Sequence, residues 1–367
     1  MAEGGVVAEF PNEPRQSAPV EPQEPSGFLG WSDPTLVALA RSVGTDLDAA
    51  LEVARSLSPV AGALGGATWS WVRTLASLGA GDLTVARVVE PHLDALAILD
   101  QAAQHDRATD DSWPSPVPTR GSTWGVYAAH APGQHLQAVA CGGEWALTGS
   151  KPWCSLADRV SHAVITAHVD EHRRQAFAVD LGHAGVRVSE DPWVARGLAH
   201  VRSTSITLTD VPATPVGPPQ WYLERPGFAW GGIGVAAVWF GAACALAQSV
   251  LDSAHRRDPD QLALTHLGRL DTALHTTLLS LRDAAERIDA GEARGSVGEL
   301  LAARVRATSA ATAELVLAET GRALGPGPLT SDEEHARRVA DLTVYVRQHH
   351  GERDLARIGA QRVREQR

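Results

Sequence analysis

The spacing of apolar residues changes twice along this chain, and these two changes restrict the fold more than any other feature. From Ser32 onward, apolar residues recur at the spacing of helices. Between Gly121 and about Gly217 they alternate with polar residues, which is typical of strands. Beyond that point the helical spacing returns and holds to the end. We therefore predict an α+β fold with an N-terminal α-helical domain, a middle β-barrel domain and a C-terminal four-helix bundle.

Composition indicates where these domains begin and end. Residues 1–27 are rich in Pro, Glu and Ser and have almost no periodic apolar residues, so we predict a disordered leader there. Pro-rich stretches at Asp110–Arg120 and Val211–Pro219 separate the helical and alternating patterns. The predicted domains therefore cover 28–118 for the helical domain, 119–220 for the β-domain and 221–367 for the bundle.

Capping residues predict the starts of the N-terminal helices. Ser32 or Asp33 can cap the first helix and Asp46 the second, because their side chains can accept hydrogen bonds from unpaired backbone amides. The stretch Gly79–Thr84 has the composition of a turn and cap, after which a long helix begins. Pro91 lies inside that helix and should kink it.

The middle region has the pattern of about seven short strands. Gly142-Gly143 separates two alternating runs, and a Gly-Gly pair there predicts a tight hairpin because both residues can adopt positive φ. Pro152 cannot donate to a β-ladder and so is expected at the end or the edge of a strand. The predicted strands are Trp124–Ala129, Leu136–Ala140, Trp145–Lys151, Val160–Val169, Ala176–Asp180, Val186–Ser189 and Ser205–Thr209.

Four long helical segments of matched length follow, separated by short Gly/Pro breaks, and this predicts an up-down bundle. Glycines 231, 232 and 234 at the start of the first segment should allow another element to approach its backbone closely. The four segments are Gly231–His255, Gln261–Ala290, Ser296–Leu324 and Asp332–Arg357.

Composition also excludes several classes of function. The chain has 367 residues and a net charge of −11, which argues against a broad nucleic-acid surface. No GxGxxG motif follows a strand, so a nicotinamide-type dinucleotide site is not expected. The three cysteines show no metal spacing, and neither a secretory signal pattern nor a run of about 18 apolar residues is present. We therefore expect a cytoplasmic protein that does not act on a membrane.

The segment GEWALTGSKPWCS, which ends at Ser155, resembles the middle-domain segment of the acyl-CoA dehydrogenase family. The stretch Gly81–Leu99 and the order of the three domains are also similar, so the resemblance covers about residues 32–360. It implies that Trp153 flanks the isoalloxazine ring of a flavin and that Ser155 hydrogen-bonds near N5 and O4. Without a flavin, the same residues would be a tryptophan packed in the barrel core and a serine that caps a turn.

The resemblance also implies further contacts with FAD. The strand at Trp124–Ala129 matches the position of a family strand whose following loop contacts the flavin, so backbone contacts from Tyr127 and Ala129 are expected. Arg257 and Gly325 occupy places similar to the family's pyrophosphate contacts, which usually come from a neighbouring subunit. The alternative for these two is a solvated helix end, where an arginine interacts favourably with the helix dipole, and an ordinary helix-breaking loop.

The expected catalytic base differs from that of the family. Where the family commonly has a Glu before Gly-Thr in the last helix, alignment on Asp341–Tyr345 places His349. A neutral imidazole can act as a base near neutral pH. The alternative is that His349 and His350 are partly exposed helix residues and that His350 pairs with Asp354 at the surface.

The resemblance implies an FAD-dependent oxidoreductase that desaturates an acyl thioester such as acyl-CoA, as in fatty acid metabolism. A carboxylate or an equivalent base would remove the α-proton while a hydride passes to flavin N5. Two alternatives stay open, namely a monooxygenase that uses reduced flavin and oxygen, and a non-catalytic partner subunit of a related chain. A homo-oligomer (dimer or tetramer) or a heteromer is expected. The aromatic stretch Trp221–Phe228 is expected to fill the interface between two domains, with a place in the wall of the substrate cavity as the alternative.

Overall fold

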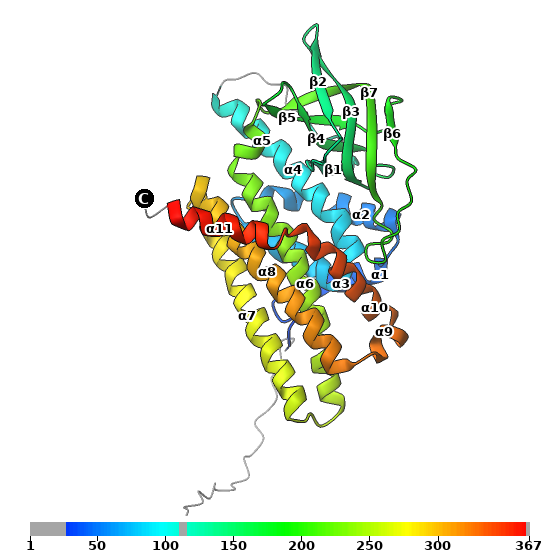
Figure 1. Cartoon of the computed structure of the whole chain (residues 1–367), viewed down its shortest axis with the longest axis vertical. Coiled ribbons are helices and arrows are strands. Elements are labelled where there is room, and N and C mark those ends of the chain that lie inside the picture. The colour runs from blue at the N-terminus through cyan, green and yellow to red at the C-terminus, as the bar shows by residue number, and fades with distance from the viewer. Residues whose placement is uncertain (1–26, 110–115, 365–367) are drawn as a thin grey trace, which may run out of the picture.

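The structure is a computed structural model that describes residues 27–109 and 116–364. Four helices come first, a seven-stranded sheet follows, and a helical bundle completes the chain (Figure 1). The predicted α+β class and the order of its three parts are confirmed. The predicted leader lies outside the described residues except for Gly27, and the domain boundaries drawn from the sequence stay predictions.

The N-terminal helices begin at the predicted caps. Asp33 accepts hydrogen bonds from two amides of the first turn of α1, and Asp46 does the same for α2. The stretch predicted as a turn is instead helical up to Gly81, and Asp82 then caps the last helix of this group. These helices are α1 (Pro34–Val43), α2 (Leu47–Leu57), η1 (Ser58–Ala63), α3 (Thr68–Gly81) and α4 (Leu83–Thr109).

All seven predicted strands are present, and their sheet closes into a barrel because β4 pairs with both β2 and β5. Gly142 and Gly143 form the predicted hairpin, with φ of 62° and 91°. The strands are β1 (Trp124–Tyr127), β2 (Leu136–Cys141), β3 (Glu144–Ser155), β4 (His162–His168), β5 (Arg174–Asp180), β6 (Val186–Val188) and β7 (Ser203–Val216).

Two of the predicted strands are too short. Strand β3 continues past Lys151 to Ser155, because its pairing with β7 shifts register between Lys151 and Cys154 and the bulge accommodates the missing amide of Pro152. Its pairing with β2 ends at Gly149, so Pro152 lies where β3 is paired on one side only, as the edge alternative predicts. Strand β7 runs beyond Thr209 to Val216, through most of the Pro-rich stretch Val211–Pro219.

The bundle contains three long helices, and its fourth segment is broken. The predicted segment Asp332–Arg357 divides into two helices separated by a short 3₁₀ turn, and Gly351 between them has φ of 54°. Figure 1 shows the second of these, α11, crossing the bundle. The elements are α5 (Trp221–Glu224), α6 (Pro226–Arg256), α7 (Gln261–Asp289), α8 (Gly295–Leu324), α9 (Gly327–Ser331), α10 (Glu333–Tyr345), η2 (Val346–Gln348) and α11 (Glu352–Arg364).

Helix α6 lies at the centre of the molecule and packs against α3, α4, α7, α8 and α10. The expectation that no run of about 18 apolar residues is present is wrong, because this helix is long and apolar enough to cross a membrane by length and composition. However, 83% of its most apolar window is buried within the protein. Its contact with α3 depends on missing side chains. A Cβ at Gly241 would lie 1.8 Å from the carbonyl oxygen of Ala76, and one at Gly79 would lie 2.4 Å from that of Val238.

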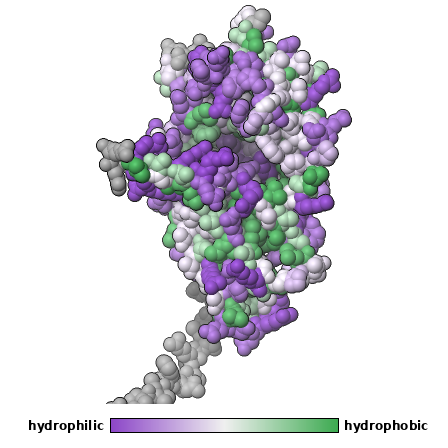
Figure 2. Space-filling model, viewed as in Figure 1, coloured by the Kyte–Doolittle hydropathy of each residue, from purple (hydrophilic) through white to green (hydrophobic). Residues whose placement is uncertain are grey.

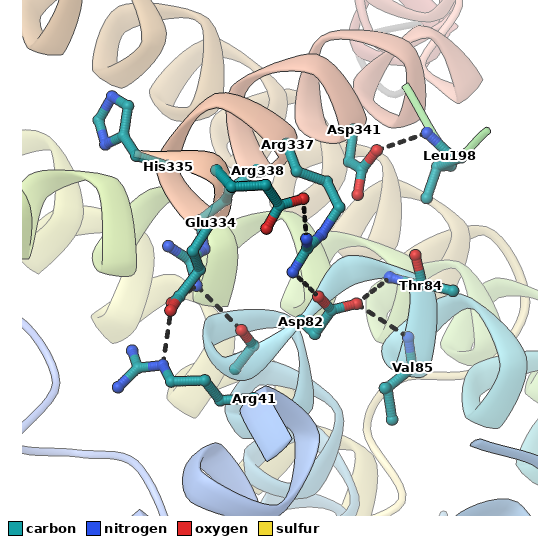
Figure 3. A network of polar contacts seen from close by, with 12 residues as sticks. Arg41, Asp82, Thr84, Val85, Leu198, Glu334, His335, Arg337, Arg338 and Asp341 are labelled. Atoms are coloured by element: carbon teal, nitrogen blue, oxygen red, sulfur yellow. Dashed lines mark hydrogen bonds and ion pairs between the residues drawn. The ribbon is translucent and has the colours of Figure 1, made fainter. Parts of the chain in front are cut away.

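Charged side chains of α10 join this helix to the first and second parts of the fold. Arg337 pairs with Asp82 at 2.9 Å, and Arg338 donates to the carbonyl of Gly81 at the end of α3. Asp341 accepts a hydrogen bond from the amide of Leu198, in the connection between β6 and β7 (Figure 3). The start of the broken helix is therefore held by both neighbouring parts.

The glycine contact between α3 and α6 leads to a first prediction. Gly241→Ala should lower the thermal unfolding midpoint, because its methyl group overlaps the backbone of α3 and overpacking costs about 1–3 kcal/mol. Gly268→Ala on α7 is the matched control, since no atom lies within 4 Å of its added Cβ. This control should raise the midpoint, because alanine favours a helix by about 1 kcal/mol over glycine. Midpoints that move in the same direction would contradict the close α3–α6 packing.

Candidate functional site

A cavity of about 590 Å³ lies where α4, the start of α6, α8 and α11 meet. Figure 2 shows a hollow between the β-domain and the bundle on the face that carries α11, with hydrophilic residues around much of its rim. A larger cavity of about 710 Å³ lies in the β-domain, but the described residues that line it include none of those predicted for the site. We therefore examine the first cavity as the candidate site.

The predicted glycines at the start of α6 bring charged groups to this cavity. A Cβ at Gly231 would lie 2.8 Å from a carboxylate oxygen of Asp94 on α4. A Cβ at Gly232 would lie 3.1 Å from the side chain of Arg306 on α8. The expected close approach is confirmed, and it places an acid and a cation against adjacent positions of one helix.

Glu90 and Asp94 are one turn apart on α4, and both line the cavity. Glu90 is buried, pairs with Arg87 at 3.2 Å and accepts from the hydroxyl of Tyr345 at 3.4 Å. Burial raises the pKa of Glu90 to about 7, although Arg87 opposes the shift. Burial also raises the pKa of Asp94, and its buried Oδ1 has no hydrogen-bond partner among the described residues.

Arg306 connects the cavity to the break in the last helix. Its guanidinium donates to the carbonyl of Gly232 at 2.8 Å and to that of Gln348 at 3.3 Å. It also lies 5.0 Å from the ring centroid of Trp239, within range of a cation–π interaction. The cation therefore ties α8 to α6 and to the residue that precedes His349.

His349 lies in the break between η2 and α11 and faces the cavity. Its side chain is only 9% exposed, and its Nε2 lies 3.8 Å from Asp354 and has no hydrogen-bond partner in the described part of the chain. Burial lowers the pKa of His349, which favours the neutral imidazole that a base requires. The alternative interpretation is wrong in placing the two histidines on a helix, because both lie between η2 and α11. Its surface pair is confirmed, since His350 is 59% exposed and its Nδ1 lies 3.6 Å from Asp354.

Trp153 is not sealed in the barrel core. The residue is 61% exposed, and its backbone has φ of 58°, a left-handed conformation that bulky residues rarely adopt. The barrel-core interpretation is therefore wrong. A large exposed ring on a strained backbone is a feature that clusters at ligand sites rather than one that stabilises a core.

Ser155 lies two residues further and connects the barrel to the cavity. Its hydroxyl contacts Ser203 at 2.7 Å and accepts from Arg87 at 3.0 Å, the same arginine that pairs with Glu90. Tyr127 is buried and donates from its hydroxyl to the carbonyl of Ser155, so it supports this segment from inside the barrel. Ala129 is exposed just beyond β1.

Arg257 and Gly325 lie away from these groups. Arg257 follows the last residue of α6, and Gly325 follows the last residue of α8 with φ of 66°. Neither is among the residues that line the cavity. Their predicted role at a cofactor shared between subunits stays a prediction.

Solved structures resemble this fold over most of its length, whereas no family model and no curated protein matches the sequence. Butyryl-CoA dehydrogenase from Megasphaera elsdenii matches with a TM-score of 0.74 and 17% identity, over 90% of this chain and 97% of that chain. TdsC of Paenibacillus sp. A11-2, solved with FMN and indole, matches with a TM-score of 0.71 and 16% identity, over 89% and 94% of the two chains. KijD3, solved with FMN and dTDP-3-amino-2,3,6-trideoxy-4-keto-3-methyl-D-glucose, has a TM-score of 0.68 and 17% identity, over 85% and 86%.

The chain has the acyl-CoA dehydrogenase fold. The resemblance stated from the sequence is thereby confirmed for the architecture. Among structures with the acyl-CoA dehydrogenase fold, TdsC has also been described as dibenzothiophene monooxygenase, so the fold alone does not select one reaction.

Sequence reasoning missed three residues of the cavity in this acyl-CoA dehydrogenase fold. Glu90 and Asp94 had a usable signal, because two acids four apart in an otherwise apolar helix share one face. Arg306 had no such signal in the sequence, because arginines on helices are usually solvated. Only the packing of α8 on α6 brings this arginine against the cavity.

The backbone at Trp153 leads to a second prediction. Trp153→Gly should be more stable than Trp153→Ala by about 1 kcal/mol, the reverse of the usual order, because only glycine adopts a left-handed φ without a Cβ clash. Guanidinium chloride unfolding of both variants measures the difference. A more stable alanine variant would show that this residue does not have positive φ.

The raised pKa of Glu90 leads to a third prediction. The folded-state pKa of about 7 lies above the unfolded value, so the stabilising contribution of protonated Glu90 is fully present below about pH 4.5 and is lost as pH rises through 7. Relative to Glu90→Gln, which cannot ionise, the wild-type unfolding free energy should fall by about 3 kcal/mol between pH 5 and pH 8. Denaturant unfolding of both proteins at each pH measures this, and a constant difference would contradict the shift.

Proposed function

We propose that this protein is a flavin-dependent oxidoreductase whose flavin lies beside Trp153 and Ser155. The observation that carries the proposal is the exposed indole held at positive φ, next to a hydroxyl that is hydrogen-bonded to the cavity network. These groups fit a flat ring system, because the indole offers a face for stacking and the hydroxyl a donor at its edge. KijD3 and TdsC, which share the fold, were solved with FMN.

We propose FAD as the cofactor, following the sequence resemblance. FAD differs from FMN by its adenosine half, and Arg257 and Gly325 are the residues that the resemblance assigns to the pyrophosphate. A homo-oligomer would bring these residues near the flavin of a neighbouring copy, and exposed leucines on α7 such as Leu262 and Leu279 favour such an interface. Mass spectrometry of the cofactor released from the purified protein distinguishes FAD from FMN.

The cavity residues would handle protons while a bound flavin would accept or supply electrons. Neutral His349 can take a proton from a substrate in the cavity, since its Nε2 is unpaired and buried. Asp354 at 3.8 Å then favours the imidazolium that forms. Arg87 holds Glu90 and Ser155 in place and links the proton-handling side of the cavity to the flavin side.

Oxygenation of a polar substrate is the reaction that we propose first. The cavity wall on α4 contains two carboxyl groups, whereas an acyl chain requires an apolar wall. Dehydrogenation of an acyl thioester is the second candidate, because His349 faces the cavity from the position where the family has its carboxylate base. A non-catalytic subunit is disfavoured because the cavity contains an imidazole nitrogen without a hydrogen-bond partner among the described residues.

The fourth prediction tests the cofactor and the base together. The purified protein should have the visible absorbance of a flavin, and Trp153→Gly should lose most of it because the stacking surface is gone. His349→Ala should retain the flavin and lose turnover by at least about 100-fold, the usual contribution of a general base. His350→Ala is the matched control and should keep both, because this neighbouring imidazole is exposed. Equal turnover of the two histidine variants would rule out His349 as the base.

The same samples separate the two reactions. Anaerobic bleaching of the flavin by butyryl-CoA and longer acyl-CoAs supports dehydrogenation. Incorporation of ¹⁸O from labelled oxygen into a substrate, with chemically reduced flavin supplied, supports oxygenation. A colourless protein that does not bind added FAD or FMN would overturn the proposed function.

A further inference from the structure

The α4 side of the cavity includes one carboxyl group, that of Asp94, which has no ion-pair partner within 4 Å among the described residues. The buried Oδ1 of Asp94 has no hydrogen-bond partner among these residues either. Glu90, one turn away, forms its ion pair with Arg87, and this arginine also donates a hydrogen bond to Ser155. A buried carboxylate without a partner is costly, so such a group usually has a ligand or a function.

Three of the four arginines that line the same cavity have other partners, whereas Arg364 at the exposed end of α11 has no hydrogen bond or ion pair with the described residues. Arg306 is held by two backbone carbonyls and by the ring of Trp239. Arg225 donates to Gln101 at 2.7 Å and lies over Tyr222, and Arg357 is 3.4 Å from Asp354. Arg225 lowers the pKa of Asp94, but burial raises it by more, so the net shift is upward. Of the two acids on α4, Asp94 is therefore the one with capacity left for an incoming positive charge.

Aromatic rings line the cavity together with these acids. Tyr222 and Phe228 meet edge to face at 5.5 Å, and both belong to the cavity lining with Asp94. The buried hydroxyl of Tyr222 is near enough to Asp94 for that carboxylate to raise its pKa. A carboxylate beside aromatic faces is the combination that binds an organic ammonium group, through an ion pair and cation–π attraction.

Building on the proposed function, we propose that the substrate of this cavity is an organic amine whose ammonium group binds Asp94, with Glu90 as a second carboxylate and Tyr222 and Phe228 as aromatic walls. A neutral alcohol of the same shape would leave Asp94 without a counterion. A carboxylate substrate would be repelled by both acids. The proposal therefore names a class of substrate by charge, separately from the reaction that follows binding.

The fifth prediction tests this charge preference by binding alone. Benzylamine and cyclohexylamine are the probes, and benzyl alcohol and cyclohexanol are their neutral counterparts of similar shape. Isothermal titration of the purified protein at pH 7.5 should show amines binding at least tenfold more tightly than the alcohols. Asp94→Asn should remove this preference, while Asp100→Asn, the same change at an exposed position on the same helix, should retain it.

Each outcome bears on one claim. Equal binding of amines and alcohols by the wild-type protein overturns the amine proposal, and this comparison stands even when Asp94→Asn does not fold. An amine preference that survives in a folded Asp94→Asn protein also overturns it. The visible spectrum of the same samples reports separately on the flavin. If the protein binds flavin but shows no amine preference, the proposed function stands and only the amine proposal is overturned. If it prefers amines but binds no flavin, the amine proposal stands and the proposed function is overturned.

Discussion

Close packing against α6 is the constraint on which the rest of this structure depends. At Gly241 of α6 the backbone of α3 lies nearer than any side chain would allow, since an added Cβ would lie 1.8 Å from the carbonyl oxygen of Ala76. Gly231 and Gly232 also allow close approach to α6, but there the neighbouring groups are charged side chains. One helix thus supplies both the apolar centre of the fold and the gap in which the cavity residues meet. Larger residues at these positions would separate the elements that form the site.

Charged side chains are costly to bury in a protein interior, and hydrogen bonds and ion pairs compensate most of those that this structure buries. Arg87, Glu90, Ser155 and Tyr345 form a continuous polar connection from the end of β3 to the cavity. Arg306 donates to one carbonyl of α6, that of Gly232, and to one at the break in the last helix, that of Gln348. Asp94 and His349 are among the exceptions, and each has a buried polar atom at the cavity without a partner among the described residues. Departures of this kind are expected at functional sites, because a ligand then completes what the fold leaves unpaired.

Much of the architecture could be predicted because periodicity and turn chemistry are local. The hairpin at Gly142-Gly143, the caps at Asp33 and Asp46 and the seven strands all follow from residues close together in the chain. The errors have one cause. The bulge at Pro152, the helical glycines at the end of α3 and the break before α11 depend on a neighbouring element that compensates for a locally unfavourable residue. Local sequence patterns contain no information about which element will lie next to such a residue.

The sequence by itself determined the order of the three parts, and it drew attention to Trp153, Ser155 and His349 through their resemblance to a known segment. Tertiary structure alone decided that the indole is exposed on a left-handed backbone and that His349 is buried. It also decided that Glu90, Asp94 and Arg306 from two distant helices share one cavity. The physical reason is that exposure, desolvation and charge pairing depend on distances across the fold, whereas periodicity depends only on positions along the chain.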